Sequence, residues 1–406
     1  MKRRVLIASV WLVASACTGG TTPNDTTTQD ATDTSQPTGL FMDRYHPTTD
    51  IATCSAATTA LESIEAASEA DQWDMVESGI AAGTPANTLL ARLDMEFIEG
   101  GSSSQYSLTG TVRQGITLGR AAMTDDQRDV AHETVAKSLA VARGLAATSG
   151  LRSAASQANA GQVATSRGAW DCAAVYFAAL EPTVREYQTQ TVMNVWGPGR
   201  NAIASDNIAD TVVDMLVRGA TAIDAAQART VIETGNETDL YLSRVYVMMS
   251  NKYAASLEDA ATAMTTVDPG WHPEGQYSFE GVIDPLVGLM GTGAVATAAR
   301  GHWRMTPMLI SRAQHLRDLG SLYAAANQPR LDAFMAAMQN DQYATVARFR
   351  GTVGALKDPF TAAGQQPAML LMQVDMARTQ LEAGNAAGAL TALQTVQSAV
   401  TSLATM

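Results

Sequence analysis

From Asp50 to the C-terminus, apolar residues recur at the three- and four-residue spacing that places side chains on one face of an α-helix. One such stripe follows Asp206, a residue type favoured at helix N-caps, and contains Ile208, Val212, Met215 and Leu216. Another runs within residues 237–265, and two more flank Gly384-Asn385, a pair that is typical of a helix end. These patterns predict an all-α protein, an irregular helical bundle that closes with a helical hairpin.

Signals for β-strands are few. Apolar residues alternate loosely over 106–112, but this stretch is rich in glycine and is equally compatible with a loop. Thr124 and Gln127 form a capping-box pattern, which predicts a helix that reaches about Thr148. A folded part of about 350 residues exceeds the usual size of one domain, so two packed helical lobes are an arrangement that the length allows.

The first 16 residues have the pattern of a secretory signal peptide. Three basic residues precede an apolar stretch that is too short to span a membrane in the mature protein, and small residues stand directly before Cys17. A cysteine at this position resembles the bacterial lipoprotein signal, in which the thiol is acylated and becomes the new N-terminus. The match departs at Ala14, where that signal prefers Leu. Acylation would hold the protein on a membrane without crossing it, whereas ordinary cleavage would leave Cys17 free.

The segment after the cysteine has the composition of a disordered tether. Residues 18–40 are rich in Thr, Asp, Gly and Pro and almost free of apolar side chains. Such a segment cannot bury enough surface to offset the entropy of ordering. We therefore expect a signal peptide over 1–16, a lipid-anchored flexible linker over 17–49 and an α-helical domain over 50–406.

Charge and cysteine content describe the mature chain further. Removal of the signal peptide leaves 24 basic and 40 acidic residues, a formal charge of −16, which argues against a nucleic-acid partner and is compatible with cation binding. If Cys17 is acylated, Cys54 and Cys172 have a single pairing. In an oxidising periplasm a disulfide between them would contribute about 5 kcal/mol on the chain-entropy model. Two reduced, buried thiols are the alternative.

Familiar catalytic and nucleotide-binding motifs are absent from the sequence. It contains no GxxxxGK[ST], GxSxG, HExxH, CxxC or EF-hand pattern, so we expect no enzyme. Five scattered histidines argue against a histidine-rich zinc or copper site, whereas abundant carboxylates leave room for a hard cation. We interpret the methionine-rich stretches, 248–249 and 369–376, as adaptable filling of the core.

Three polar segments are candidates for a cation site. Segment 168–177 contains Asp171, and segment 229–253 contains Glu233 and Glu237 at a four-residue spacing, where like charges destabilise a helix unless a cation or an arginine lies between them. Segment 271–280 combines three potential ligands at an expected loop-to-helix junction, namely His272, Glu274 and Tyr277. The structural alternatives are core packing for Trp170 and Tyr176 and a solvated helix face for the two glutamates.

In this order, the three segments resemble the low-iron-inducible periplasmic protein family first associated with algal iron assimilation. The likeness lies in A-W-D-x-A-A-x-Y-F at 169–177, K-Y-A at 252–254, and E-G-Q-Y-x-F with I-x-P-L-V within 274–287. It covers about residues 165–290, and Cys172 stands where the family has an acidic residue. The resemblance implies a secreted helical protein of iron acquisition without established catalysis.

Carried over onto this chain, the resemblance implies Asp171 and Glu274 as the first iron ligands, with Glu237, Tyr277 and His272 as weaker ones. Imelysin-like lipoproteins, a second iron-linked helical family, share the expected address and helical character. Their GxHxxE signature is missing, because His272 and Glu274 have a different spacing.

Two functions follow as expectations. The first is a lipoprotein that binds iron, or another hard cation, for acquisition. Thr18 after the acylated cysteine favours the outer membrane, facing the periplasm or the exterior, by analogy with Gram-negative sorting. The alternative is a non-catalytic α-helical scaffold that docks another envelope protein.

Overall fold

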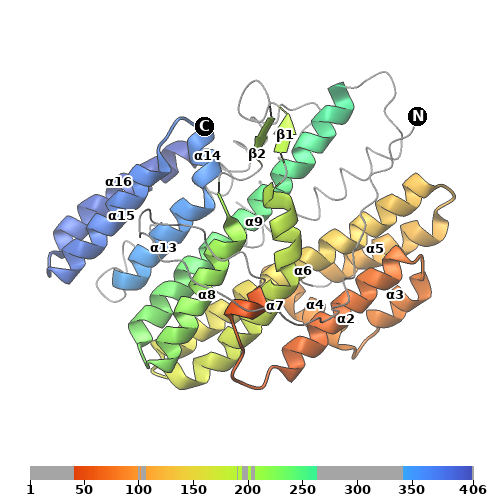
Figure 1. Cartoon of the computed structure of the whole chain (residues 1–406), viewed down its shortest axis with the longest axis horizontal. Coiled ribbons are helices and arrows are strands. Elements are labelled where there is room, and N and C mark those ends of the chain that lie inside the picture. The colour runs from red at the N-terminus through yellow and green to blue at the C-terminus, as the bar shows by residue number, and fades with distance from the viewer. Residues whose placement is uncertain are drawn as a thin grey trace, which may run out of the picture. The chain divides into compact units, whose positions relative to one another are not determined.

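Helices make up nearly all of the chain that the structure, a computed structural model, describes: residues 41–98, 101, 107–189, 191–193, 200–202, 206–262 and 342–404. The helices are α1 (Phe41–Arg44), α2 (Ala52–Glu69), α3 (Trp73–Gly79), α4 (Pro85–Phe97), α5 (Leu108–Ala121), α6 (Asp125–Asn159), α7 (Val163–Thr189), α8 (Ile208–Asp224), α9 (Ala228–Thr262), α13 (Gln342–Ala355), α14 (Lys357–Ala362), α15 (Pro367–Glu382) and α16 (Ala386–Ala404) (Figure 1). Two three-residue strands, β1 (Thr191–Met193) and β2 (Arg200–Ala202), pair antiparallel between α7 and α8. The all-α prediction is confirmed.

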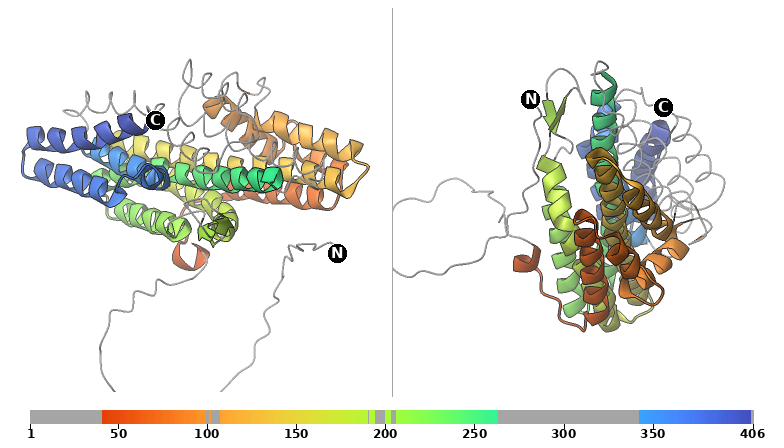
Figure 2. Two further views of the ribbon diagram at one scale, coloured as in Figure 1. Left: turned by 90° about the horizontal axis from the view of Figure 1, so that it is seen from above. Right: turned by 90° about the vertical axis from the view of Figure 1, so that its right-hand side faces the viewer.

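The core is built around α6, which packs against α2, α4, α5, α7 and α9. Helix α9 extends the packing to α8 and α13, and the α15–α16 hairpin packs on α13 (Figures 1 and 2). The described residues from 41 to 404 belong to one compact unit. None of the helices in the described ranges is long and apolar enough to cross a bilayer.

Small residues let the central helices approach closely. A Cβ atom added to Gly150 of α6 would lie 2.8 Å from the carbonyl oxygen of Ala169 in α7. The ring of Trp170, which is fully buried, occupies the space beside Gly219 of α8 and donates a hydrogen bond from Nε1 to the Leu216 oxygen at 2.9 Å. Trp170 is therefore a core residue, as the structural alternative predicted.

Local sequence signals account for several helix ends. The Thr124–Gln127 capping box is formed and begins α6. The N-cap of α8 is Asn207, one residue after the Asp206 that the sequence favoured, and its side chain accepts a hydrogen bond from the Asp210 amide. Gly384 has φ of +74° and ends α15, so the predicted closing hairpin is also present.

Other boundaries differ from the sequence predictions. Helix α6 continues to Asn159, beyond the predicted end near Thr148, and α9 begins at Ala228, nine residues before the predicted 237. Both helices are packed on several sides, so their apolar residues do not form the single stripe that periodicity detects. The described part of 106–112 belongs to α5, whose N-cap is Ser107, and not to a strand.

A disulfide joins Cys54 of α2 to Cys172 of α7, with 5.6 Å between the Cα atoms. It closes a loop across a sequence separation of 118 residues, which contains α3 to α6. The pairing predicted from the cysteine count is confirmed. Cys17 lies outside the described residues.

Candidate functional site

Asp171, the first ligand implied by the family resemblance, is a buried anchor for residues 45–49, near the start of the described chain. Its carboxylate is 0% exposed and accepts hydrogen bonds from the hydroxyl of Tyr45 at 2.6 Å and from the backbone amides of Thr48 and Thr49 at 2.9 and 3.0 Å. The Thr49 hydroxyl and Arg167 Nε donate as well, at 2.8 Å each. Five donors on two oxygens occupy this carboxylate in a structural role.

These contacts set the charge state of the anchor. Burial alone would raise the pKa of Asp171, but the hydrogen bonds from Tyr45, Thr48, Arg167 and Thr49 outweigh burial and hold the pKa below its usual value. Burial and the same carboxylate raise the pKa of Tyr45, which therefore stays a neutral donor. Asp171 is ionised at neutral pH and is neutralised locally by Arg167.

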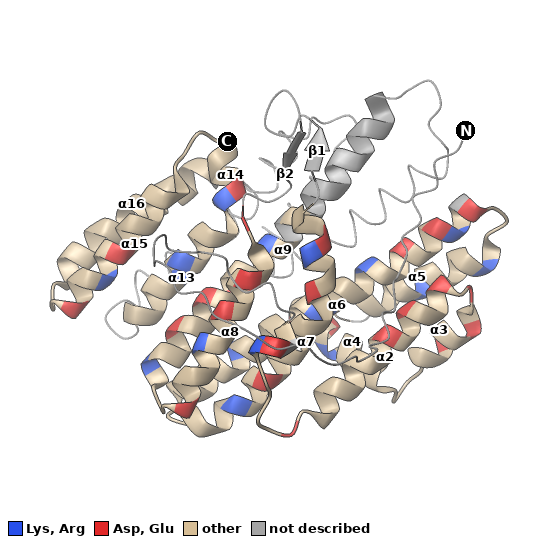
Figure 3. Cartoon of the chain, viewed as in Figure 1, with Lys and Arg blue, Asp and Glu red and all other residues tan. Residues whose placement is uncertain are grey.

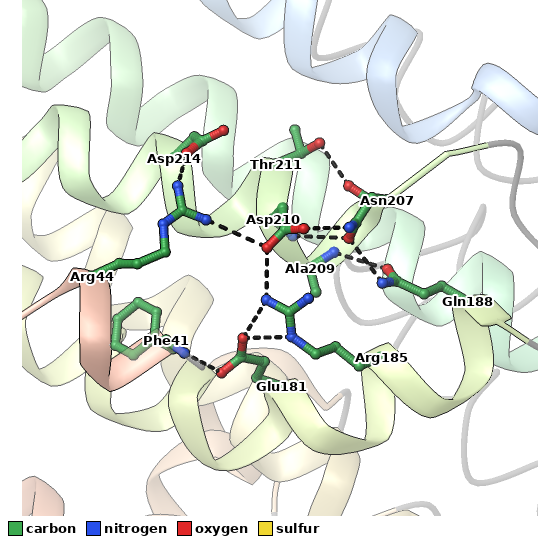
Figure 4. Close-up of polar contacts among 10 residues, drawn as sticks. All are labelled: Phe41, Arg44, Glu181, Arg185, Gln188, Asn207, Ala209, Asp210, Thr211 and Asp214. Atoms are coloured by element: carbon green, nitrogen blue, oxygen red, sulfur yellow. Dashed lines mark hydrogen bonds and ion pairs between the residues drawn. The ribbon is translucent and has the colours of Figure 1, made fainter. Parts of the chain in front are cut away.

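A second buried acidic cluster fixes the same N-terminal segment to α7 and α8 (Figure 4). Glu181 accepts from the Phe41 amide at 2.9 Å and from Arg185 Nε at 2.8 Å. Arg185 also pairs with Asp210 at 2.7 Å, and Arg44 reaches Asp210 at 3.4 Å and exposed Asp214 (Figure 4). Segment 41–49 is thus docked on the helices and belongs to the folded part, which was expected to begin at Asp50.

Glu237 belongs to a separate network of charges on α8, α9, α13 and α15. It pairs with Arg218 at 2.7 Å and with Arg350 at 4.0 Å, while Glu233 pairs with Arg229 at 2.9 Å and with Arg378 at 3.1 Å. Both glutamates line a cavity of about 250 Å³ together with three of these arginines. The like charges at four-residue spacing are therefore offset by arginines, one of the two solutions that the sequence allowed.

The iron-ligand constellation is not assembled in the part of the chain that the structure describes. Asp171 and Glu237 have different partners, and Asp171 does not line the cavity that Glu237 lines. His272, Glu274 and Tyr277 lie outside the described residues. Among the residues that the structure describes, no group of three His, Cys, Asp or Glu side chains could hold a metal ion.

The closing hairpin has an exposed apolar stripe. Met369, Met372 and Met376 are 50%, 57% and 48% exposed and form a stripe on α15, on a different face from the buried side chains of Leu370, Val374, Ala377 and Leu381. Helix α16 contains no Lys, Arg, Asp or Glu in its 19 residues (Figure 3). Apart from Ala386 and Ala387, its exposed positions carry uncharged polar residues, namely Thr391, Gln394, Thr395, Ser398, Thr401 and Ser402.

Sequence reasoning missed this surface, because it assigned the methionines of 369–376 to the core. That prediction is wrong for Met369, Met372 and Met376, although Met248 of the other stretch is 1% exposed. A signal was available: α15 has enough Leu, Val and Ala for one buried stripe, and the methionines follow a second stripe with the spacing i, i+3, i+7. Two apolar stripes on one helix predict two contact surfaces.

The comparisons with known proteins identified no match. No protein-family model matches the chain, and neither the curated proteins nor the solved structures gave a significant match.

Proposed function

We propose that the protein is a non-catalytic helical scaffold of the bacterial cell envelope, attached to a membrane through acylated Cys17, that docks another envelope protein on the α15–α16 hairpin. The observation that carries the proposal is the exposed methionine stripe of Met369, Met372 and Met376. We infer a partner that presents an uncharged, largely apolar helix or groove.

The chemistry of the hairpin favours a protein contact. Methionine side chains are flexible and polarisable, so they fit irregular partner surfaces and are common at adaptable binding sites. The buried centres of protein interfaces are depleted of charged residues, and α16 has none. The stripe also lies on a helix whose other face is anchored in the core, so docking requires no unfolding.

The N-terminal segment supports the tethered arrangement. Phe41, Arg44 and Thr48 belong to the first segment that the structure describes, and buried carboxylates on α7 and α8 hold them through hydrogen bonds. A pull on the linker of an acylated protein would act on this anchored segment. The hairpin lies at the opposite end of the sequence and contributes none of these contacts, so docking and tethering use different parts of the molecule.

Site-specific photo-crosslinking in the native envelope tests the docking proposal. A benzoylphenylalanine is placed at Met372 or Thr395 of the hairpin, and matched controls carry it at Met75 and Met95, which are 60% and 75% exposed on α3 and α4. We expect one discrete adduct from the hairpin positions that is absent from the control positions. A triple change of Met369, Met372 and Met376 to Gln should remove the Thr395 adduct. Identical adducts from all four positions, or none from the hairpin, would contradict the proposal.

Attachment is tested independently by labelling growing cells with an alkynyl fatty acid. The wild-type protein should take up the label and sediment with membranes, whereas Cys17→Ser should do neither. Retention of the label in Cys17→Ser would contradict acylation at this residue.

Iron binding makes a different prediction for the same preparation. It requires metal to bind the purified protein at micromolar concentration and the binding to weaken in Glu237→Gln and Glu274→Gln. Metal content after periplasmic expression, followed by calorimetric titration with iron, measures this directly. The scaffold proposal expects docking to persist after metal is removed with a chelator.

A further inference from the structure

A cleft of about 620 Å³ lies beside the disulfide, between α2, α4, α6 and α7. It is distant in sequence from the α15–α16 hairpin and shares no residue with it. Its volume falls within the range of sites that hold small organic ligands, about 300–1,000 Å³. We propose that this cleft binds a single-chain amphipathic organic anion, with the chain along the apolar wall and the anionic head on Arg92.

The apolar wall comes from small side chains on facing helices. Ala57 of α2, Ala146 of α6 and Ala169 of α7 line the cleft, as do Leu89 and the Cys54–Cys172 bridge. The disulfide fixes α2 against α7, and the tight contact at Gly150 fixes α6 against α7. The helices therefore cannot collapse into the space that the small residues leave, and the cleft is preformed.

One charged group faces this space. Among the described residues that line the cleft, Arg92 of α4 is the only one with a charge. Its Nη1 donates to the Ser149 hydroxyl at 2.7 Å, and Ser149 in turn donates to Glu96 at 2.7 Å. Glu96 lies 3.5 Å from Arg92 but does not line the cleft.

Tyr176 completes the polar end. It lines the cleft and is 5% exposed, and its burial raises its pKa despite the nearby guanidinium of Arg92, so it stays a neutral hydroxyl. Ser149 and Glu96 hold the guanidinium in place through a hydrogen bond and an ion pair. A guanidinium with five N–H donors on a planar fork matches a carboxylate or phosphate head.

The sequence motif that drew attention to Asp171 also supplies this wall. Ala169, Cys172 and Tyr176 follow one another at i, i+3 and i+7 on α7 and line the cleft, whereas Asp171 is turned to the N-terminal segment. One helix segment thus anchors the chain with one face and forms the cleft with another.

Fluorescence titration with 11-(dansylamino)undecanoate tests the proposal, using the mature chain with Cys17→Ser so that no detergent is needed. We expect saturable one-site binding with a blue-shifted emission. Arg92→Gln should weaken binding at least 10-fold, and Ala56→Trp, an exposed mouth position that lines the cleft, should abolish it. Arg113→Gln and Ala66→Trp, exposed positions that do not line the cleft, are the matched controls and should bind like the wild type.

Competition identifies the head group. Dodecanoate or dodecyl phosphate, below their micellar concentrations, should displace the probe. The stronger of the two competitors indicates whether the site prefers a carboxylate or a phosphate head group. Dodecyltrimethylammonium, a cation, should not displace the probe. The difference between anion and cation should vanish in Arg92→Gln. Circular dichroism confirms that each variant is folded. Absence of saturable binding by the wild type, or wild-type binding by both Arg92→Gln and Ala56→Trp, overturns the proposal. Neither result alters the crosslinking outcome at the hairpin.

Discussion

The two ends of the described chain use charge in opposite ways. The N-terminal segment, residues 41–49, is fixed by Asp171, Glu181 and Asp210, three carboxylates that are at most 2% exposed. The C-terminal hairpin has an uncharged helix, α16, and an exposed methionine stripe on α15. In this acidic chain the described candidate carboxylates are occupied by internal partners, whereas the hairpin combines an exposed methionine stripe on α15 with a helix, α16, that has no charged residue.

The comparison shows why composition alone does not identify a cation site. An excess of acidic residues favoured a cation site, but a carboxylate can bind a cation only if its oxygens are not already occupied. The oxygens of Asp171 accept five hydrogen bonds, and Glu237 is paired with two arginines. Burial and partners, and not residue type alone, decide between a structural and a functional acid.

The largest effect is expected from Asp171→Ala. The change removes the acceptor of the Tyr45 hydroxyl, of two backbone amides and of Arg167 Nε in a buried place, although Arg167 Nη1 keeps its ion pair with Asp224. Removing one partner of a buried ion pair costs about 3–5 kcal/mol, and we expect a loss of this size in urea unfolding. The control is Asp214→Ala, whose carboxylate is 51% exposed and pairs with Arg44, for which about 0–1 kcal/mol is expected. Equal losses for the two variants would contradict the division between anchoring and surface acids.

The second effect concerns the disulfide. Replacing Cys54 and Cys172 together by Ser frees a loop that spans 118 residues of sequence separation. We expect a loss of about 2–5 kcal/mol in unfolding free energy, with the helical content retained at 25 °C. Reduction of the wild-type protein should reproduce the loss, and the double variant should be insensitive to reductant. The hairpin lies outside the closed loop, so its crosslinks should survive the change.

Both of these features illustrate what the sequence could predict. Helical periodicity, the Thr124–Gln127 capping box, the Gly384 helix end and the Cys54–Cys172 pair all depend on local spacing or on elimination, and the structure contains each of them. The partners of Asp171 could not be predicted, because Tyr45, Thr48 and Thr49 lie more than 120 residues before it. No local rule relates such distant segments. The sequence therefore indicated Asp171 as a candidate residue but could not predict that its role is structural.

The cleft and the docking surface were missed for a similar reason. In the sequence, small residues such as Ala57 and Ala146 indicate only buried positions on helices. The cleft that they line is visible only when the four helices are packed together. Methionine is equally common in cores and at contact surfaces, so the exposure of Met372 is decided by whether a neighbouring helix covers it. The sequence contains the residue type, but it does not indicate which helix packs next to that residue.

Acid should weaken the N-terminal anchor. The pKa of Asp171 is held below its value in the unfolded chain, so its stabilising contribution is complete above the unfolded pKa of about 3.9 and is lost as the pH falls through the folded pKa. Asp206 should act in the same direction. Burial raises its pKa, but the charges of Arg244 and Lys357 outweigh burial, so the pKa is lowered overall. Unfolding free energy should therefore decrease as the pH falls below about 4, and Asp171→Asn should show a shallower decrease. An unchanged pH dependence in Asp171→Asn would contradict this role.

A smaller effect is expected where the hairpin turns. Gly384 has φ of +74°, and its amide donates to the Leu381 oxygen at 2.9 Å to close α15. A left-handed backbone costs an L-residue about 1–2 kcal/mol, so Gly384→Ala should lower stability by about that amount. Asn tolerates this conformation better, and Gly384→Asn should therefore recover part of the loss in the same urea titration. Equal losses for Ala and Asn would show that the strain lies elsewhere.

The smallest effect on stability and the sharpest effect on docking should come from adding charge to α16. Thr391→Lys and Ser398→Lys alter two exposed positions that are seven residues apart, so both side chains lie on one face of the helix. Exposed substitutions of this kind change the unfolding free energy by no more than about 0.5 kcal/mol. A partner that packs on an uncharged surface must desolvate both ammonium groups, so the crosslink from Met372 should fall at least 10-fold. Ser63→Lys with Ala66→Lys, exposed on α2, is the matched control and should leave the crosslink unchanged. If the α16 variant still crosslinks like the wild type, the uncharged face of α16 does not contact the partner. The proposed difference between the two ends of the chain would then depend on the methionine stripe of α15 alone.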